Sequence, residues 1–144
     1  RWGLRRDSWA GLGVAAGDTR ARKVLLVEAE DAIAEPLAKG LRSEGFAVDR
    51  VASGLAALEA PEPDLVLLDL NMPKMDGREV CRALRAESRT RDVPVVVLTA
   101  SSSDVDIMQG FQDGATDYIT KPFAPAMVRT RVRSWLLRSA SVRS

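Results

Sequence analysis

Residues 63–77 read P-D-L-V-L-L-D-L-N-M-P-K-M-D-G. The four apolar residues 65–68 lack the polar alternation of a half-exposed strand, which predicts a strand buried on both faces. The run stops at one carboxylate, Asp69, and the following proline and Asp76-Gly77 indicate a turn and the start of a helix. Open α/β sheets place their chemistry at the carboxyl ends of such strands, so Asp69 is a candidate functional residue. The alternative is that Asp69 only caps a loop.

The same alternation of apolar strand and amphipathic helix extends over most of the chain. Further strands are predicted at 24–27, 46–51, 93–98 and 118–119, and helices at about 33–45, 53–59, 76–87, 104–114 and 125–138. Ser53 is the predicted N-cap of the second helix, and Pro36 is interpreted as marking the first turn of the first helix. From the last three helices we expect these residues to face the core: Val80, Leu84, Ile107, Met108, Phe111, Met127, Val128, Val132, Trp135 and Leu136. Five strands alternating with five helices predict an α/β fold, a doubly wound parallel sheet.

Composition sets limits on the class of protein. The 144 residues are 46% hydrophobic and 28% charged, as in an ordinary single globular domain. No apolar run approaches the roughly 20 residues of a membrane helix, and a signal peptide is not indicated, so we expect a cytoplasmic protein and no membrane partner. The chain has no His and one Cys, which excludes a zinc-type cluster, an internal disulfide and Ser-His or Cys-His catalysis.

Charge is unevenly distributed along the chain. Residues 1–23 carry a net charge of +4 and residues 124–144 carry +5, whereas the body between them carries −8. We interpret residues 1–22 as a flexible basic extension, 23–138 as the folded domain and 139–144 as a C-terminal tail. Basic ends can contact nucleic acid, but they are more often solvated, so we do not expect this chain to bind nucleic acid.

The carboxyl ends of the predicted strands bring together a distinctive set of side chains. The first strand ends in Glu28, the third in Asp69, the fourth in Thr99 and the fifth is followed by Lys121. A carboxylate can attack phosphorus, and the phosphoryl oxygens then need a cation, a positive side chain and a hydroxyl donor. Mg²⁺ prefers such oxygen ligands. Together these residues predict a site that accepts a phosphoryl group.

These residues and three motifs make the chain resemble the receiver domain of two-component response regulators. The motifs are residues 63–77, V-P-V-V-V-L-T-A at 93–100 and G-A-T-D-Y-I-T-K-P-F at 114–123. The resemblance implies a flavodoxin-like sheet of order 2-1-3-4-5 with five helices. It also implies site roles: Asp69 as phosphoacceptor, Lys121 and Thr99 stabilising the phosphoryl group, Thr99 and Tyr118 as the switch pair, Glu28, Asp69 and the Asn71 backbone carbonyl as Mg²⁺ ligands, and a cis Lys121–Pro122 bond.

One position departs from the family pattern. Receiver domains normally end the first strand with two adjacent acids, whereas this chain has Glu28 followed by Ala29. The methyl group of Ala29 cannot coordinate a cation, so we expect weak or absent Mg²⁺ binding. Glu30 or Asp31 could swing in as a replacement. The loss opens an alternative, a phosphorylation-independent pseudo-receiver that acts as a protein-interaction module.

The resemblance also implies partners. We expect a histidine kinase or phosphotransfer protein as donor, an output domain or separate effector, and no enzymatic activity beyond self-catalysed aspartyl phosphorylation and dephosphorylation. A homodimer through the last two helices and the fifth strand is possible. Asp117 and Arg131 match one charge pair of that interface, but Gln109 and Met127 replace another. A third hypothesis, a flavodoxin-like enzyme with a small-molecule cofactor, lacks a phosphate-binding loop and stacking aromatic residues.

Overall fold

The computed structural model describes residues 22–72, 77–100 and 103–143. The extension predicted at 1–22 and the helix start predicted at Asp76 therefore lie outside the described residues, except for Arg22. The elements, in chain order, are β1 (Lys23–Val27), α1 (Asp31–Ser43), β2 (Ala47–Val51), α2 (Gly54–Glu59), β3 (Leu65–Asp69), α3 (Gly77–Ala86), β4 (Val95–Thr99), α4 (Asp104–Gln112), β5 (Asp117–Thr120) and α5 (Pro125–Arg143).

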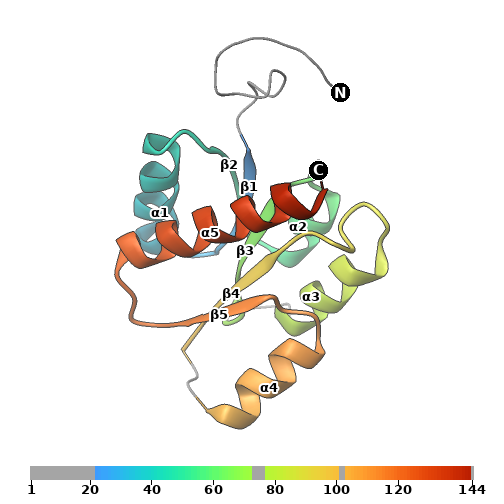
Figure 1. Ribbon diagram of the computed structural model, residues 1–144. Coiled ribbons are helices and arrows are strands. Elements are labelled where there is room, and N and C mark those ends of the chain that lie inside the picture. The colour runs from blue at the N-terminus through green and yellow to red at the C-terminus, as the bar shows by residue number, and fades with distance from the viewer. Residues whose placement is uncertain (1–21, 73–76, 101–102, 144) are drawn as a thin grey trace.

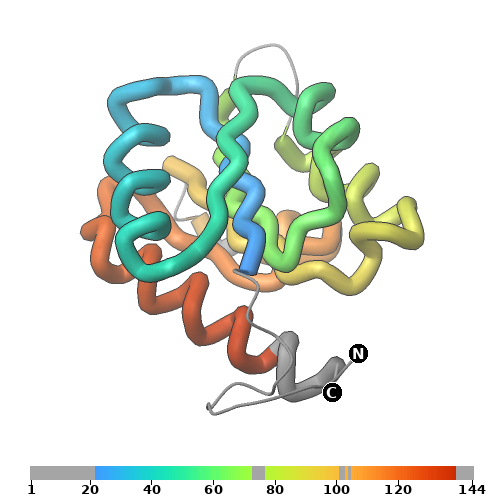
Figure 2. The backbone as a smooth tube through the Cα atoms, turned by 90° about the horizontal axis from the view of Figure 1, so that it is seen from above, coloured from blue at the N-terminus to red at the C-terminus, as the bar shows by residue number. Residues whose placement is uncertain are grey.

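The sheet confirms the predicted fold. Its five strands run in the order β2-β1-β3-β4-β5, and each neighbouring pair is parallel. Helices α1 and α5 cover one face, and α2 and α3 lie on the other (Figures 1 and 2). Every residue of β3 and of β4 is buried, because side chains of both faces pack under helices. This explains why those two strands lack polar alternation.

Two helix ends follow local sequence signals. The Ser53 hydroxyl accepts the backbone N–H of Ala56 at 3.2 Å, which confirms the predicted N-cap of α2. Gly45 follows α1 with a φ of +99°, a left-handed conformation that glycine adopts without steric cost. Helix α1 runs through Pro36 without a break, as interpreted, but it begins at Asp31, so Pro36 lies beyond the first turn rather than in it. No helix in the described part of the chain is long and apolar enough to cross a membrane.

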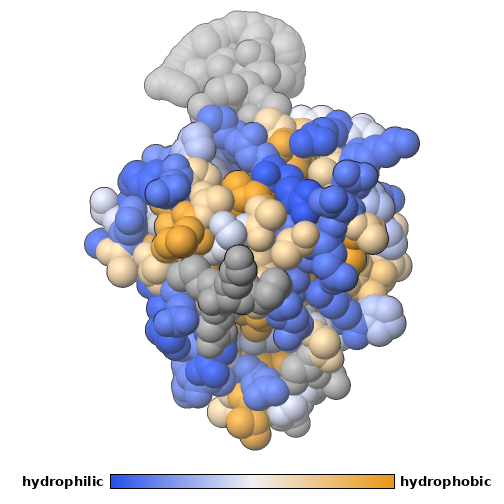
Figure 3. Space-filling view, turned by 180° about the vertical axis from the view of Figure 1, so that it is seen from behind, coloured by the Kyte–Doolittle hydropathy of each residue, from blue (hydrophilic) through white to orange (hydrophobic). Residues whose placement is uncertain are grey.

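Helix α4 differs from the expectation for its apolar residues. Met108 and Phe111 are 62% and 46% exposed instead of facing the core. The reason is that α4 packs through Gly110, over which the Tyr118 ring lies: a Cβ added to Gly110 would meet the Tyr118 hydroxyl at 1.9 Å. The apolar residues around Gly110 therefore lie on the outer side, and Figure 3 shows hydrophobic surface at the lower end of the molecule, where α4 lies.

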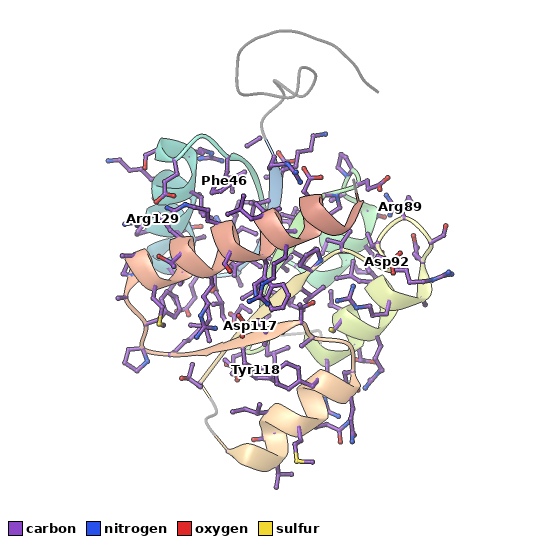
Figure 4. The ribbon with its side chains drawn as sticks, viewed as in Figure 1. Phe46, Arg89, Asp92, Asp117, Tyr118 and Arg129 are labelled. Carbon is purple, nitrogen blue, oxygen red and sulfur yellow. The ribbon has the colours of Figure 1, made fainter. Side chains whose placement is uncertain are left out.

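Helix α5 meets the expectation in part. Val128, Val132 and Leu136 are buried as predicted, whereas Met127, in the first turn, is 39% exposed. The helix continues to Arg143, beyond the end predicted at Arg138. Arg129 and Arg133 both pair with Glu44 at the end of α1, which fastens α5 to α1 (Arg129 is labelled in Figure 4).

Candidate functional site

Asp69 lies at the centre of the carboxyl edge of the sheet. It is the last residue of the buried strand β3 and is 2% exposed. Its Oδ1 accepts a hydrogen bond from the Lys121 ammonium at 3.0 Å and another from the backbone N–H of Asn71 at 3.0 Å. The Lys121 backbone N–H donates to the Thr99 carbonyl at 2.7 Å, and the Lys121–Pro122 bond is cis. A carboxylate and an ammonium from distant parts of the chain thus form an ion pair in which Asp69 is buried and Lys121 is half-buried.

Glu28 lies beside Asp69 and is fully buried. Its Oε2 accepts the backbone N–H of Glu30 at 3.2 Å, whereas Oε1 has no hydrogen-bond partner among the described residues. Burial, together with the adjacent Asp69 carboxyl, raises the pKa of Glu28 to about 7. The raised pKa reflects two acids held close together in a site that water hardly enters.

These residues fit a divalent cation only in part. The unpartnered Oε1 of Glu28 is a buried oxygen that a cation would satisfy, and the Asp69 carboxylate and the Asn71 carbonyl could add oxygen ligands. Ala29, half-buried, offers only a methyl group. Within the described part of the chain, no group of three or more acidic, His or Cys side chains is placed to hold a metal ion. The site therefore has one anionic ligand fewer than the family pattern.

The two acids considered as replacements for the missing ligand, Glu30 and Asp31, both lie at the surface. Arg50, near the end of β2, donates from Nε to the Glu28 carbonyl at 2.9 Å and from its guanidinium to the Asp31 carboxylate at 2.6 Å. Asp31 therefore points to Arg50 at the surface, with its side chain 74% exposed. Glu30 is also exposed. The structure does not bring Asp31 into the pocket.

Thr99 and Tyr118, the residues expected to act as a switch pair, line one cavity of about 170 Å³ together with Asn71 and Arg78. Thr99 is 3% exposed at the end of β4. The Tyr118 hydroxyl donates to the Asp106 carbonyl at 3.3 Å, and its ring lies 5.5 Å from that of Phe111. In Figure 4 Tyr118 lies on the α4 side of β5 and Asp117 on the α5 side. Thr99 and Tyr118 thus border the same cavity.

Several contacts of the site could not be anticipated from sequence patterns. The Asn71 side chain accepts the backbone N–H of Ala100, and Arg50 braces the turn after β1. Asp113, at the end of α4, is 8% exposed and pairs with Arg78 and Arg82 of α3 at 2.7 and 3.0 Å. Polar residues of loops and exposed helix faces have no periodicity that would reveal such partners.

Comparison with known proteins gives a consistent result. The family model of the response regulator receiver domain matches residues 24–133. The DNA-binding response regulator MtrA of Mycobacterium tuberculosis is 46% identical over 125 residues, which is 85% of this chain and 54% of that protein. The sensory transduction protein RegX3 of Mycolicibacterium smegmatis is 45% identical over 120 residues, 81% of this chain and 51% of that protein. The chain spans about half the length of these relatives.

Solved structures show the same likeness. The receiver domain of the sensor histidine kinase PA1611 from Pseudomonas aeruginosa, which has a magnesium ion coordinated in its active site cleft, is 32% identical with a TM-score of 0.73, covering 81% of this chain and 98% of that chain. The chemotaxis response regulator CheY4 of Vibrio cholerae is 30% identical with a TM-score of 0.75, covering 80% of this chain and 98% of that chain. The fold, the family model and these relatives agree, and the chain belongs to the family of response regulator receiver domains.

Proposed function

We propose that this domain accepts a phosphoryl group on Asp69 and signals through a rearrangement of Thr99 and Tyr118. The observation that carries the proposal is the buried Asp69 carboxylate paired with Lys121 at 3.0 Å, beside Glu28 and Thr99 at one sheet edge. Response regulator receiver domains are generally not enzymes, and the chemistry proposed here is confined to the domain's own aspartate.

The proposed step is an in-line displacement at phosphorus. An oxygen of the Asp69 carboxylate forms a bond to the phosphorus atom of the donor, and the bond from phosphorus to the donor's imidazole nitrogen breaks. The products are an aspartyl acyl phosphate and an unphosphorylated donor His, whose nitrogen retains the bonding electron pair. Because Oδ1 already accepts two N–H donors, Oδ2 is the better-placed nucleophile.

Two residues stabilise the transferred group in this proposal. The Lys121 ammonium lies within hydrogen-bond distance of Asp69 and offsets negative charge on the phosphoryl oxygens. The Thr99 hydroxyl supplies a hydrogen bond to one of these oxygens, and its displacement lets Tyr118 enter the cavity that both residues line. Mg²⁺ held by Glu28, Asp69 and the Asn71 carbonyl would neutralise further charge, although Ala29 weakens its binding.

Ala29 supports a second candidate function. A pocket that lacks one anionic ligand can hold its cation too weakly for efficient phosphorylation, since losing one preorganised electrostatic group typically costs about 10²–10³ in rate. The domain would then act as a pseudo-receiver, a module that binds its partner without phosphotransfer. The intact Asp69–Lys121 pair favours the first function over this one.

The partners follow from the proposed chemistry. The donor is a histidine kinase or phosphotransfer protein, and it can approach over an apolar cavity of about 510 Å³ beside the site. This cavity lies between α1 and the residues after β5 and is lined by Ala32, Ile33, Pro36, Leu37, Lys121, Pro122, Phe123 and Pro125. Lys121 borders both the cavity and Asp69, so a helix docked there would place its His next to the acceptor. By analogy with the relatives, an output domain or separate effector receives the signal.

A homodimer through α4, β5 and α5 is also part of the proposal, but the one matching charge pair, Asp117 and Arg131, is formed within the chain. Asp117 accepts hydrogen bonds from Arg131 and from the Trp135 indole N–H, both at 2.8 Å. Exposed Met108, Phe111 and Met127 leave an apolar contact as the more plausible basis for such a dimer.

The test is intact-mass spectrometry after incubation with acetyl phosphate and Mg²⁺. Wild type is expected to gain the mass of one phosphoryl group, and Asp69→Ala is expected to gain none. Lys121→Ala keeps the Asp69 carboxylate and should still gain the phosphoryl group, but more slowly, because the stabilising ammonium is lost. Wild type without an adduct at saturating Mg²⁺ would favour the pseudo-receiver.

A further inference from the structure

The side chain of Asn71, as well as its backbone, forms a hydrogen bond at the site. Its Oδ1 accepts the backbone N–H of Ala100 at 2.9 Å, while its own backbone N–H donates to Asp69 Oδ1 at 3.0 Å. Asn71 follows β3 and Ala100 follows β4. One residue thereby joins the phosphoacceptor to the loop that carries the end of β4.

This contact closes a ring of hydrogen bonds around the site. From Asp69 the ring passes through Asn71 to Ala100, and from the adjacent Thr99 carbonyl to the Lys121 backbone N–H at 2.7 Å. It returns to Asp69 through the Lys121 ammonium at 3.0 Å. The carboxyl ends of β3, β4 and β5 are thus tied to one another, and the Asn71 carboxamide supplies the link between β3 and β4 in this ring.

The hydrogen bond between Asn71 and Ala100 lies next to the switch candidates Thr99 and Tyr118. Asn71 and Thr99 line the same 170 Å³ cavity as Tyr118. Ala100 is the next residue after Thr99, so a backbone displacement that carries Thr99 toward Asp69 would move the Ala100 N–H relative to the Asn71 oxygen. The hydrogen bond therefore resists a backbone displacement at Thr99 and Ala100.

We propose that Asn71 is a positioning residue whose carboxamide holds Ala100, the first residue of the loop after β4, and hence Thr99, in its resting place. Its loss frees the Ala100 backbone, while the backbone N–H and carbonyl of Asn71 remain. The net worth of one hydrogen bond at an exposed position corresponds to an equilibrium shift of about two- to tenfold. The consequence for switching rests on the proposed function, whereas the restraint on the loop does not.

The primary test measures hydrogen exchange of the Ala100 amide by NMR in unphosphorylated, metal-free protein. Asn71→Ala should speed this exchange about two- to tenfold. Asn71→Asp keeps an acceptor oxygen at the same place and should restore slow exchange. The Leu70 amide, which donates to the Leu98 carbonyl, is the internal control and should not change. Unchanged Ala100 exchange in Asn71→Ala, or no recovery in Asn71→Asp, would overturn the proposal.

A second readout separates this proposal from the proposed function. In unphosphorylated, metal-free Asn71→Ala the Thr99 and Tyr118 resonances should move part of the way toward their positions in the phosphorylated wild type. Faster Ala100 exchange without any shift of Thr99 would contradict the link to the switch. If the wild type takes no phosphoryl group, the proposed function fails, yet the exchange result still decides whether Asn71 restrains the loop.

Discussion

At position 29 a half-buried methyl group packs against the hydrophobic cluster on the α2–α3 face of the sheet. The acid that the family pattern has there would lie beside Glu28 and Asp69, both buried. Arg50 holds Asp31 at the surface, so the turn does not supply a substitute. The cation affinity of this receiver domain is therefore expected to depend mainly on a single side chain.

Ala29→Asp should tighten Mg²⁺ binding and speed phosphorylation by acetyl phosphate, by up to about 10²–10³-fold, because it restores a preorganised anionic ligand. Calorimetric titration measures the affinity, and intact mass followed over time measures the rate. Ala47→Asp adds the same charge at an exposed position at the amino-terminal edge of the sheet and serves as the control. Equal Mg²⁺ affinity in the two variants would show that Ala29 is not the missing ligand.

Glu28 should make the stability of the metal-free protein depend on pH. Its folded pKa, about 7, lies above the ordinary value of 4.5, so the folded state binds more protons than the unfolded state between these values. This contribution to stability is fully present below pH 4.5 and is lost as the pH rises through 7.

Urea unfolding in EDTA measures this dependence. Between about pH 5 and pH 8, wild type should lose roughly 1–3 kcal/mol relative to Glu28→Gln, which cannot ionise. Parallel stability curves for the two proteins would contradict a raised pKa at Glu28.

Among the elements, α4 is joined to the domain through Gly110 and through the residues at its C-terminal end. Tyr118 packs over Gly110, and Asp113 receives Arg78 and Arg82 from α3. Arg85, also on α3, donates to the Gly114 carbonyl and to the Thr116 hydroxyl. Of the outer apolar residues of α4, Phe111 packs against the Tyr118 ring, whereas Val105 and Met108 are largely exposed and available for a partner.

Asp113→Asn should destabilise the domain by about 1–2 kcal/mol at neutral pH, because it removes a buried charge that two arginines satisfy. Hydrogen bonds from Arg78 hold the pKa of Asp113 below its usual range, so its contribution is present above about pH 4 and is lost as the pH falls further.

Chemical denaturation at neutral and at acidic pH tests this, with Glu87→Gln as the control. Glu87 pairs with Arg89 at 3.3 Å, but both side chains are about half exposed, so its loss should cost much less. A destabilisation in Asp113→Asn that persists unchanged in acid would contradict the ionic origin.

For the whole molecule, the sequence predicts the fold more completely than the site. Uninterrupted apolar runs such as 65–68 and 95–98 predict the central strands, and the strand ends predict Glu28, Asp69, Thr99 and Lys121 at one edge. Periodicity failed for α4, where Met108 and Phe111 face outward because Gly110 makes the contact. It also gave no sign of the Arg50–Asp31 or Asn71–Ala100 contacts, since these join polar loop residues that no repeating pattern marks.

The central claim is that Asp69 accepts a phosphoryl group, and chemical trapping tests it most directly. The chain is incubated with a phosphodonor and Mg²⁺ and then treated with borohydride, which reduces an acyl phosphate to an alcohol. Peptide mass spectrometry then locates the reduced residue. We predict homoserine at position 69 in wild type and at no position in Asp69→Ala. Reduction at another carboxylate, or at none despite saturating donor and Mg²⁺, would contradict the assignment of Asp69 as phosphoacceptor.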